Sequence, residues 1–185
     1  MEGFREVFMK NLFLHIQSII NTLNATVAPE ELIRFFDFDL GQLDQETPPV
    51  SYPCVLLAFG NTAWQQIGRY SNLGETTINL RIAFKLYERT HSKNDPTFQA
   101  QALQHLDTIA LLKKKIAYTE GTDFSPLLLA AEQNETRADL RVYNLTFTTS
   151  ITEDYQDADP NPFIPWQELQ PPFPNANGPE FCFHT

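Results

Sequence analysis

Apolar side chains recur every three or four residues near the start of the chain, which is the spacing of one face of an α-helix. The pattern runs from Phe4 to Leu23 and predicts a long amphipathic helix over residues 3–24. Phe13 and Ile20 widen this apolar stripe. The wider stripe indicates that the helix contacts a sheet on one side and a further surface, such as a second subunit, on another.

A second long helix is predicted over residues 95–121. Asp95 stands before Pro96, the cap-then-proline order of a helix start, and apolar residues follow at helical spacing until Gly121. The basic run 113–115 falls in the last turn, where cations offset the negative end of the helix dipole. This structural role accounts for the lysines without a phosphate site.

A shorter helix is expected to open at Pro29 and to run through residue 35, with residues 36–49 as a loop. Four acids gather in this stretch, and they could in principle supply oxygens to a divalent cation: Asp37, Asp39, Asp44 and Glu46. They lack the spaced glycine and terminal glutamate of a calcium loop. We therefore interpret the stretch as a solvated acidic loop.

Strand patterns occupy the middle of the chain. An apolar run at 54–59 ends at Gly60 and Asn61, and 64–70 is predicted to be its hairpin partner. After a turn at 72–74, apolar and polar residues alternate over about eleven positions, which predicts a strand with one buried face and one wet face. The apolar members are Ile78, Leu80, Ile82, Phe84 and Leu86.

Segments 127–133 and 140–151 flank a polar turn and predict a second hairpin. In the later strand the apolar positions change phase after Val142, which indicates either a bulge or burial on both faces. The fold class that these patterns predict is α+β: an antiparallel sheet built from two hairpins and packed against two main helices, with an extended proline-rich C-terminal arm.

Composition separates the arm from the domain. The net charge is −10, and residues 153–185 hold six acids, no lysine or arginine, and seven of the 13 prolines. Prolines exclude a central strand or a long helix there. We therefore divide the chain into an α+β domain, 1–152, and an acidic arm rich in proline and aromatic residues, 153–185.

The charge and the apolar runs also exclude classes of function. A strongly acidic chain repels phosphate backbones, which argues against nucleic-acid recognition. The longest apolar runs, 55–59 and 127–131, are far shorter than a membrane span, and charged residues interrupt any signal-peptide core near the N-terminus. We expect a cytoplasmic protein in which Cys54 and Cys182 are reduced and buried.

Candidate chemistry is sparse. His105 and Asp107 lie two apart on a helix and point to different sides, so they cannot act as a base and its orienting partner. All four histidines, His15, His91, His105 and His184, are interpreted as ordinary surface or satisfied structural residues. No serine-nucleophile, dinucleotide-binding or phosphate-loop motif is present in the sequence. We expect no enzymatic activity and no cofactor.

The order of the predicted elements is a long helix, an apolar strand, a long hairpin, a helix, a second hairpin and an arm. With segments 52–57, 76–84 and 140–145, this order resembles the tail-terminator, tail-completion and minor tail proteins of phages and prophages. The resemblance implies a ring, commonly hexameric, that contacts tail-tube or connector proteins. It also implies assembly in the cytoplasm of a bacterial host and a final place in the virion tail.

We expect self-association through the long hairpin, residues 64–87, and one helix face, because a hairpin of that length exceeds what a compact sheet needs. The arm is expected to dock on a folded surface of its own or a neighbouring subunit through its aromatic residues. The candidate interaction residues are Trp64, Tyr70, Arg81, Lys85, Phe163, Trp166, Phe173 and Phe181. Two other functions stay open: a monomeric protein-binding adaptor, and a small enzyme with a site on the loop 37–46.

Overall fold

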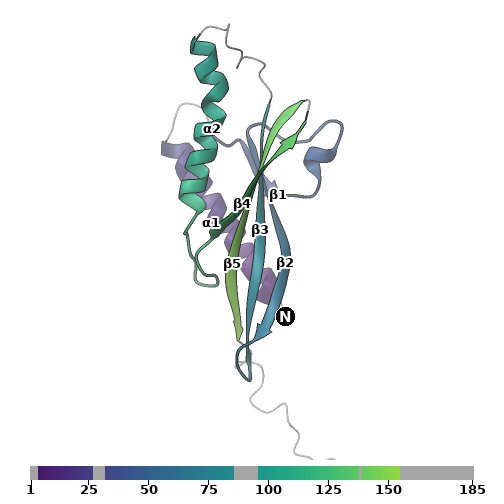
Figure 1. Ribbon diagram of the computed structural model, residues 1–185, viewed down its shortest axis with the longest axis vertical. Helices are drawn as coiled ribbons and strands as arrows, with labels where there is room; N and C mark the ends of the chain where they lie inside the picture. The colour runs from purple at the N-terminus through teal and green to yellow at the C-terminus, as the bar shows by residue number, and fades with distance from the viewer. Residues whose placement is uncertain (1–3, 27–31, 86–95, 138, 155–185) are drawn as a thin grey trace, which may run out of the picture.

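The computed structural model describes residues 4–26, 32–85, 96–137 and 139–154 (Figure 1). Its elements follow the order α1 (Phe4–Thr26), β1 (Phe35–Phe38), a 3-10 turn (Gln42–Asp44), β2 (Cys54–Gln66), β3 (Ser71–Lys85), α2 (Pro96–Ile116), β4 (Leu128–Thr136) and β5 (Leu140–Asp154). The predicted α+β class, both long helices and the second hairpin are confirmed. The arm residues from 155 onward lie outside the described residues.

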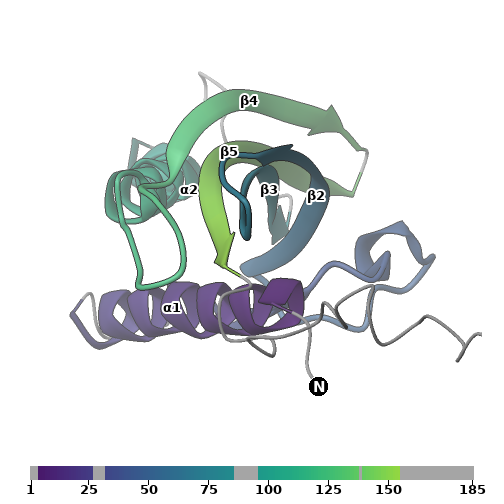
Figure 2. The same cartoon turned by 90° about the horizontal axis from the view of Figure 1, so that it is seen from below.

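The five strands form one sheet in the order β1-β2-β3-β5-β4. All neighbours pair antiparallel except β1, which pairs parallel to β2. Viewed along its long axis, the sheet is strongly curled, with α1 across one side and β4 on the opposite side (Figure 2). The long strands β2, β3 and β5 continue side by side toward one end of the molecule (Figure 1).

The predicted first hairpin is wrong in its boundaries. Residues 54–59 and 64–66 belong to the single strand β2, whose pairing with β3 shifts in register between Phe59 and Thr62. Gly60 and Asn61 therefore mark a bulge rather than a turn, because extra residues can be absorbed in a strand without ending it. The turn itself lies at 67–70, where Ile67 and Gly68 both donate backbone N–H groups to the carbonyl of Ser71.

The interpretation of residues 29–49 is also wrong in part. Residues 27–31 lie outside the described residues, but 32–35 are not helical, and Phe35–Phe38 form β1 in place of the expected loop. The parallel pairing of β1 with Cys54–Leu57 explains this outcome. A strand of four residues is too short to show a period, so its pairing with a distant partner determines its conformation.

The main core lies between the two helices and one face of the sheet. From the helices it contains Phe8, Leu12, Ile16, Leu112 and Ile116, and from the strands Ile78, Leu80, Ile82, Leu145 and Phe147. Each of these side chains is almost completely buried. This is the apolar face that the alternating strand pattern predicts.

A second, smaller cluster covers the opposite face of the sheet near β1. It consists of Leu43, Cys54, Leu56, Ala83, Leu140 and Val142. Ala83 is fully buried there, so the face predicted to be wet is wet only in part. The change of phase along β5 is explained by burial on both faces, because β5 pairs with β3 without any shift in register.

The expected second-subunit contact of α1 is not required by its wide apolar stripe. Phe13 stacks on Phe36 and Phe38 of β1, with ring centroids 4.6 and 4.5 Å apart. Ile20 is buried in the main core of the same chain. The second side of the helix is thus occupied by the short parallel strand that the sequence pattern did not reveal.

Candidate interaction surfaces

The long strands form a three-stranded extension that we call the tip ribbon, defined as residues 62–76 of the β2–β3 hairpin and 149–154 of β5. Pairing of β2 with β1 ends at Leu57, and pairing of β5 with β4 ends at Thr148. Within the described residues, the outer edges of the ribbon have no further strand partner. A backbone bond from Ser125 to the carbonyl of Ser150 covers one position of the β5 edge.

Trp64 lies across the ribbon opposite a glycine. It pairs directly with Gly74, which in turn pairs with Ile151. A Cβ atom on Gly74 would approach the Trp64 ring to 2.7 Å, so the glycine provides the space in which the ring lies. An aromatic ring placed over a strand glycine covers backbone that would otherwise be exposed.

The turn and the adjoining end of β2 carry large exposed side chains. Trp64 is 42% exposed, Ile67 56% and Tyr70 40%. The guanidinium carbon of Arg69 lies 5.2 Å from the centre of the Tyr70 ring, within range of a cation–π interaction. Two of the predicted interaction residues, Trp64 and Tyr70, are therefore both exposed at this end of the sheet.

Arg81 lies at the centre of an ion-pair network on the other face of the sheet. Its Nε and Nη2 atoms each donate to one carboxylate oxygen of Glu135, both at 2.9 Å. Its Nη1 lies 3.2 Å from Asp39 Oδ2, and its Nη2 lies 3.2 Å from Asp44 Oδ1. Asn144 donates a further hydrogen bond to Glu135 at 2.6 Å. The network joins β3, β4, β5 and the segment after β1.

The network perturbs its ionisable groups. The hydrogen bonds from Arg81 hold the pKa of the Glu135 carboxyl below its usual range, and the pKa of Arg81 is raised in turn by Glu135. Only 9% of the Asp39 side chain is exposed. The interpretation of this stretch as a solvated loop is thus wrong for Asp39, whereas Asp44 is exposed, with 64% of its side chain accessible, although it also pairs with Arg81. In the described part of the chain, no group of three acidic, histidine or cysteine residues could hold a metal ion.

The candidate interaction residues do not form a single surface. Lys85 is exposed at the end of β3 that is remote from Tyr70. At about 3.4 Å per residue, the two ends of β3 are roughly 48 Å apart. Arg81 lies between these two ends, and its guanidinium is paired with carboxylates of the same chain. Phe163, Trp166, Phe173 and Phe181 lie outside the described residues, so the predicted docking of the arm stays a prediction.

Sequence reasoning did not identify a further exposed surface on the edge strand β4. Leu128 is 49% exposed and Leu129 42%, and Ala130 and Ala131 beside them are also exposed. Tyr118, which is 77% exposed, donates its backbone N–H to the carbonyl of Leu127 and so lies beside this strand. The sequence signal for this surface is the uncharged run 127–131 next to a turn. That run indicates an exposed apolar edge only once the strand order is known.

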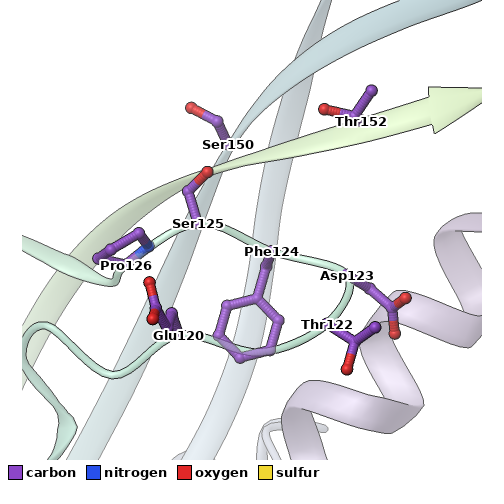
Figure 3. Close-up of a pocket in the computed structure, with 8 residues that line it drawn as sticks. All are labelled: Glu120, Thr122, Asp123, Phe124, Ser125, Pro126, Ser150 and Thr152. Carbon is purple, nitrogen blue, oxygen red and sulfur yellow. The ribbon is translucent and has the colours of Figure 1, made fainter.

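A shallow hollow of about 380 Å³ lies beside the loop that follows α2 (Figure 3). Its lining is mostly polar and includes Glu120, Asp123, Ser125, Ser150 and Thr152. Asp123 accepts a hydrogen bond from Asn11, and Ser125 is bonded through its backbone to Ser150. No histidine or cysteine is among the residues that line it.

The buried histidine and cysteine have structural environments. His105 Nε2 lies 3.1 Å from the hydroxyl of Tyr143, and its ring contacts Phe84. The predicted structural role of His105 is confirmed. Cys54 is a free, buried thiol, and burial raises its pKa to about 11. His91, His184 and Cys182 lie outside the described residues.

None of the helices in the described part of the chain is long and apolar enough to cross a membrane. No protein-family model and no curated protein matches the chain. Among solved structures, it is similar to a chain of the virion of a native gene transfer agent particle. The two are 10% identical, the TM-score is 0.38, and the match covers 64% of this chain and 78% of the other.

Proposed function

We propose that this chain is a structural assembly protein of a phage or prophage tail that acts as a ring-forming tail terminator or completion protein. The observation that carries the proposal is the tip ribbon, which extends beyond the pairing with β1 and β4 and exposes Trp64, Ile67 and Tyr70. Large side chains at the end of an open-edged ribbon favour contact with another chain.

The positions of the open edges support a head-to-tail contact between copies. Among the described residues, the tip ribbon offers one open edge along the distal part of β2 and another along the distal part of β5, on opposite sides of β3. A contact between two different surfaces of identical subunits repeats around an axis and closes into a ring when the rotation permits. The ring would then contact tail-tube or connector proteins.

The described ionisable groups support a role without catalysis. The carboxylates of Asp39, Asp44 and Glu135 all pair with Arg81. Bound in this way, they are engaged in structure rather than available as a general acid or base. We therefore propose that the protein has no enzymatic activity.

The proposal is tested by replacing the exposed apolar residues of the turn. We expect the unmodified protein to assemble and the variant carrying Ile67→Lys and Tyr70→Lys to be monomeric, because lysines at a strand end oppose edge pairing. The matched control is Leu40→Lys, at a residue that is 81% exposed. Its neighbour Asp39 is bonded to Leu57, ten residues along the chain from Ile67. The control should leave assembly unchanged.

The measurements are solution mass by light scattering over a wide concentration range and negative-stain images, with thermal unfolding to verify that each variant is folded. Rings from the unmodified protein and the control, with monomers from the double variant, support the proposal. A strict monomer at all concentrations would contradict it and favour the adaptor function. Rings that persist in the double variant would exclude the tip ribbon as the contact.

A further inference from the structure

The exposed apolar surface beside β4 lacks a cover in the described part of the chain. We call it the β4 edge patch and define it as Tyr118, Leu128, Leu129, Ala130 and Ala131. Strand β4 is the last strand of the sheet, so the backbone groups along its outer edge have no strand partner among the described residues. An apolar edge strand of this kind pairs with other chains unless something protects it.

Positive charge borders the patch on one side. Lys113 lies in the last turn of α2 and pairs with Glu132 of β4 at 2.8 Å, which places that turn against the strand. Lys114 and Lys115 follow in the same turn and are exposed. Tyr118 lies two residues beyond the end of α2. The surface thus combines apolar side chains, an open strand edge and lysines.

We infer that the β4 edge patch binds the C-terminal segment 155–185 of the same chain. That segment has the complementary chemistry, with aromatic side chains to cover the leucines and acids to face the lysines. Its aromatic residues are Tyr155, Phe163, Trp166, Phe173, Phe181 and Phe183, and its acids are Asp157, Asp159, Glu168 and Glu180. It contains no lysine or arginine.

The segment also starts close enough to reach the patch. Leu128 pairs with Thr148, and β5 continues from there to Asp154, so the chain leaves the sheet roughly 20 Å from Leu128 at about 3.4 Å per residue. Residues 155–163 can span roughly 30 Å when extended. The aromatic residues from Phe163 onward can therefore lie on β4 of their own subunit.

Tethering favours this segment over a second copy of the chain. A covalently linked segment is present at an effective concentration in the millimolar range, whatever the protein concentration. When the segment covers the β4 edge, that aggregation-prone strand is no longer exposed to solvent. The tip ribbon stays free for contact with another copy. The inference is independent of ring formation, because it concerns a different edge of the sheet.

The experiment uses the full-length protein with Leu129 replaced by the photoreactive residue p-benzoylphenylalanine, which keeps a large apolar side chain at the site. After irradiation, the products are separated by mass and the cross-linked peptides are identified by mass spectrometry. The matched control carries the same residue at Leu14 of α1, which is 50% exposed against 42% for Leu129. Helix α1 lies on the opposite side of the molecule from β4 (Figure 2).

We expect cross-links from position 129 to residues within 155–185, in a product of single-chain mass whose yield does not change on dilution. Position 14 should give none. Cross-links from 129 that never include the segment, or equal yields from both positions, would overturn the inference. A product of double mass that disappears on dilution would overturn it too, and would assign the edge to a second copy.

A second comparison tests the role of charge. The variant with Lys114→Glu and Lys115→Glu should lower the yield of the cross-link from position 129 several-fold, because acids would then face the acids of the segment. Lys10→Glu, at an exposed lysine of α1, should not alter the yield. An unchanged yield in the double variant would overturn the claim that charge complementarity selects the segment.

Discussion

Replacing Arg81 by methionine should destabilise the fold by leaving carboxylates without their partner. The guanidinium is bound to Asp39, Asp44 and Glu135, and only 16% of the Arg81 side chain and 9% of the Asp39 side chain are exposed. Removing one partner of a buried ion pair costs about 3–5 kcal/mol. Because Glu135 and Asp44 are more exposed and can be hydrated, we expect a loss of about 2–4 kcal/mol for Arg81→Met.

The loss should depend on pH in a definite direction. The pKa of Glu135 is lowered in the folded protein, so its pairing contributes stability above the unfolded value of about 4.3 and loses it as pH falls through the folded value. In Arg81→Met this lowering is absent. The stability difference between the two proteins should therefore be full at pH 7 and shrink below about pH 4.

The assay is urea unfolding followed by far-ultraviolet circular dichroism, at pH 7 and at pH 3.5. At this chain length, about 2–4 kcal/mol corresponds to a decrease in melting temperature of ~5–15 °C. Arg34→Met, at an exposed arginine outside the network, is the control and should change stability by less than about 0.5 kcal/mol. A loss from Arg81→Met below about 1 kcal/mol, or one that does not shrink in acid, would refute this reasoning.

Two further predictions concern Gly74 and Cys54. Gly74→Ala should cost about 1–3 kcal/mol in urea unfolding, because the new methyl overlaps the Trp64 ring; it should cost clearly less in a Trp64→Ala background, and an equal cost would exclude the ring as the cause. With Cys182→Ser in place, Cys54 should not react with a thiol reagent at pH 8 until the protein is unfolded, because burial raises its pKa to about 11. Fast reaction of the folded protein would contradict its burial.

Periodic patterns predicted the elements that depend on local sequence. The helix of residues 4–26 and the helix of residues 96–116 follow from three- and four-residue spacing, and the hairpin of β4 and β5 follows from its polar turn. The packing of both helices on one face of the sheet also agrees with the apolar positions of β3. In each of these elements, the buried residues recur at a regular spacing within one short stretch of the sequence.

The failures share a dependence on partners that are distant in sequence. Gly60 and Asn61 were interpreted as a turn, whereas the pairing with β3 absorbs them in a bulge. The ion pairs of Arg81 with Asp39 and Glu135 join residues 42 and 54 positions apart, which no local spacing reveals. The exposed edge of β4 could be recognised only after the strand order was known. Long-range pairing, rather than local propensity, decides these features.

The continuous pairing of β3 with β5 has a mechanical consequence. The two strands pair from Ser71 with Asp154 to Lys85 with Leu140 without a shift in register. One ladder of hydrogen bonds therefore connects the tip ribbon to the part of the sheet that has an apolar cluster on each face. A force applied at the tip acts along these strands, and the hydrogen bonds of the ladder lie across its direction. Many of these hydrogen bonds must then break at the same time rather than one after another. The two strands thus transmit force from the tip to the core without an intervening hinge.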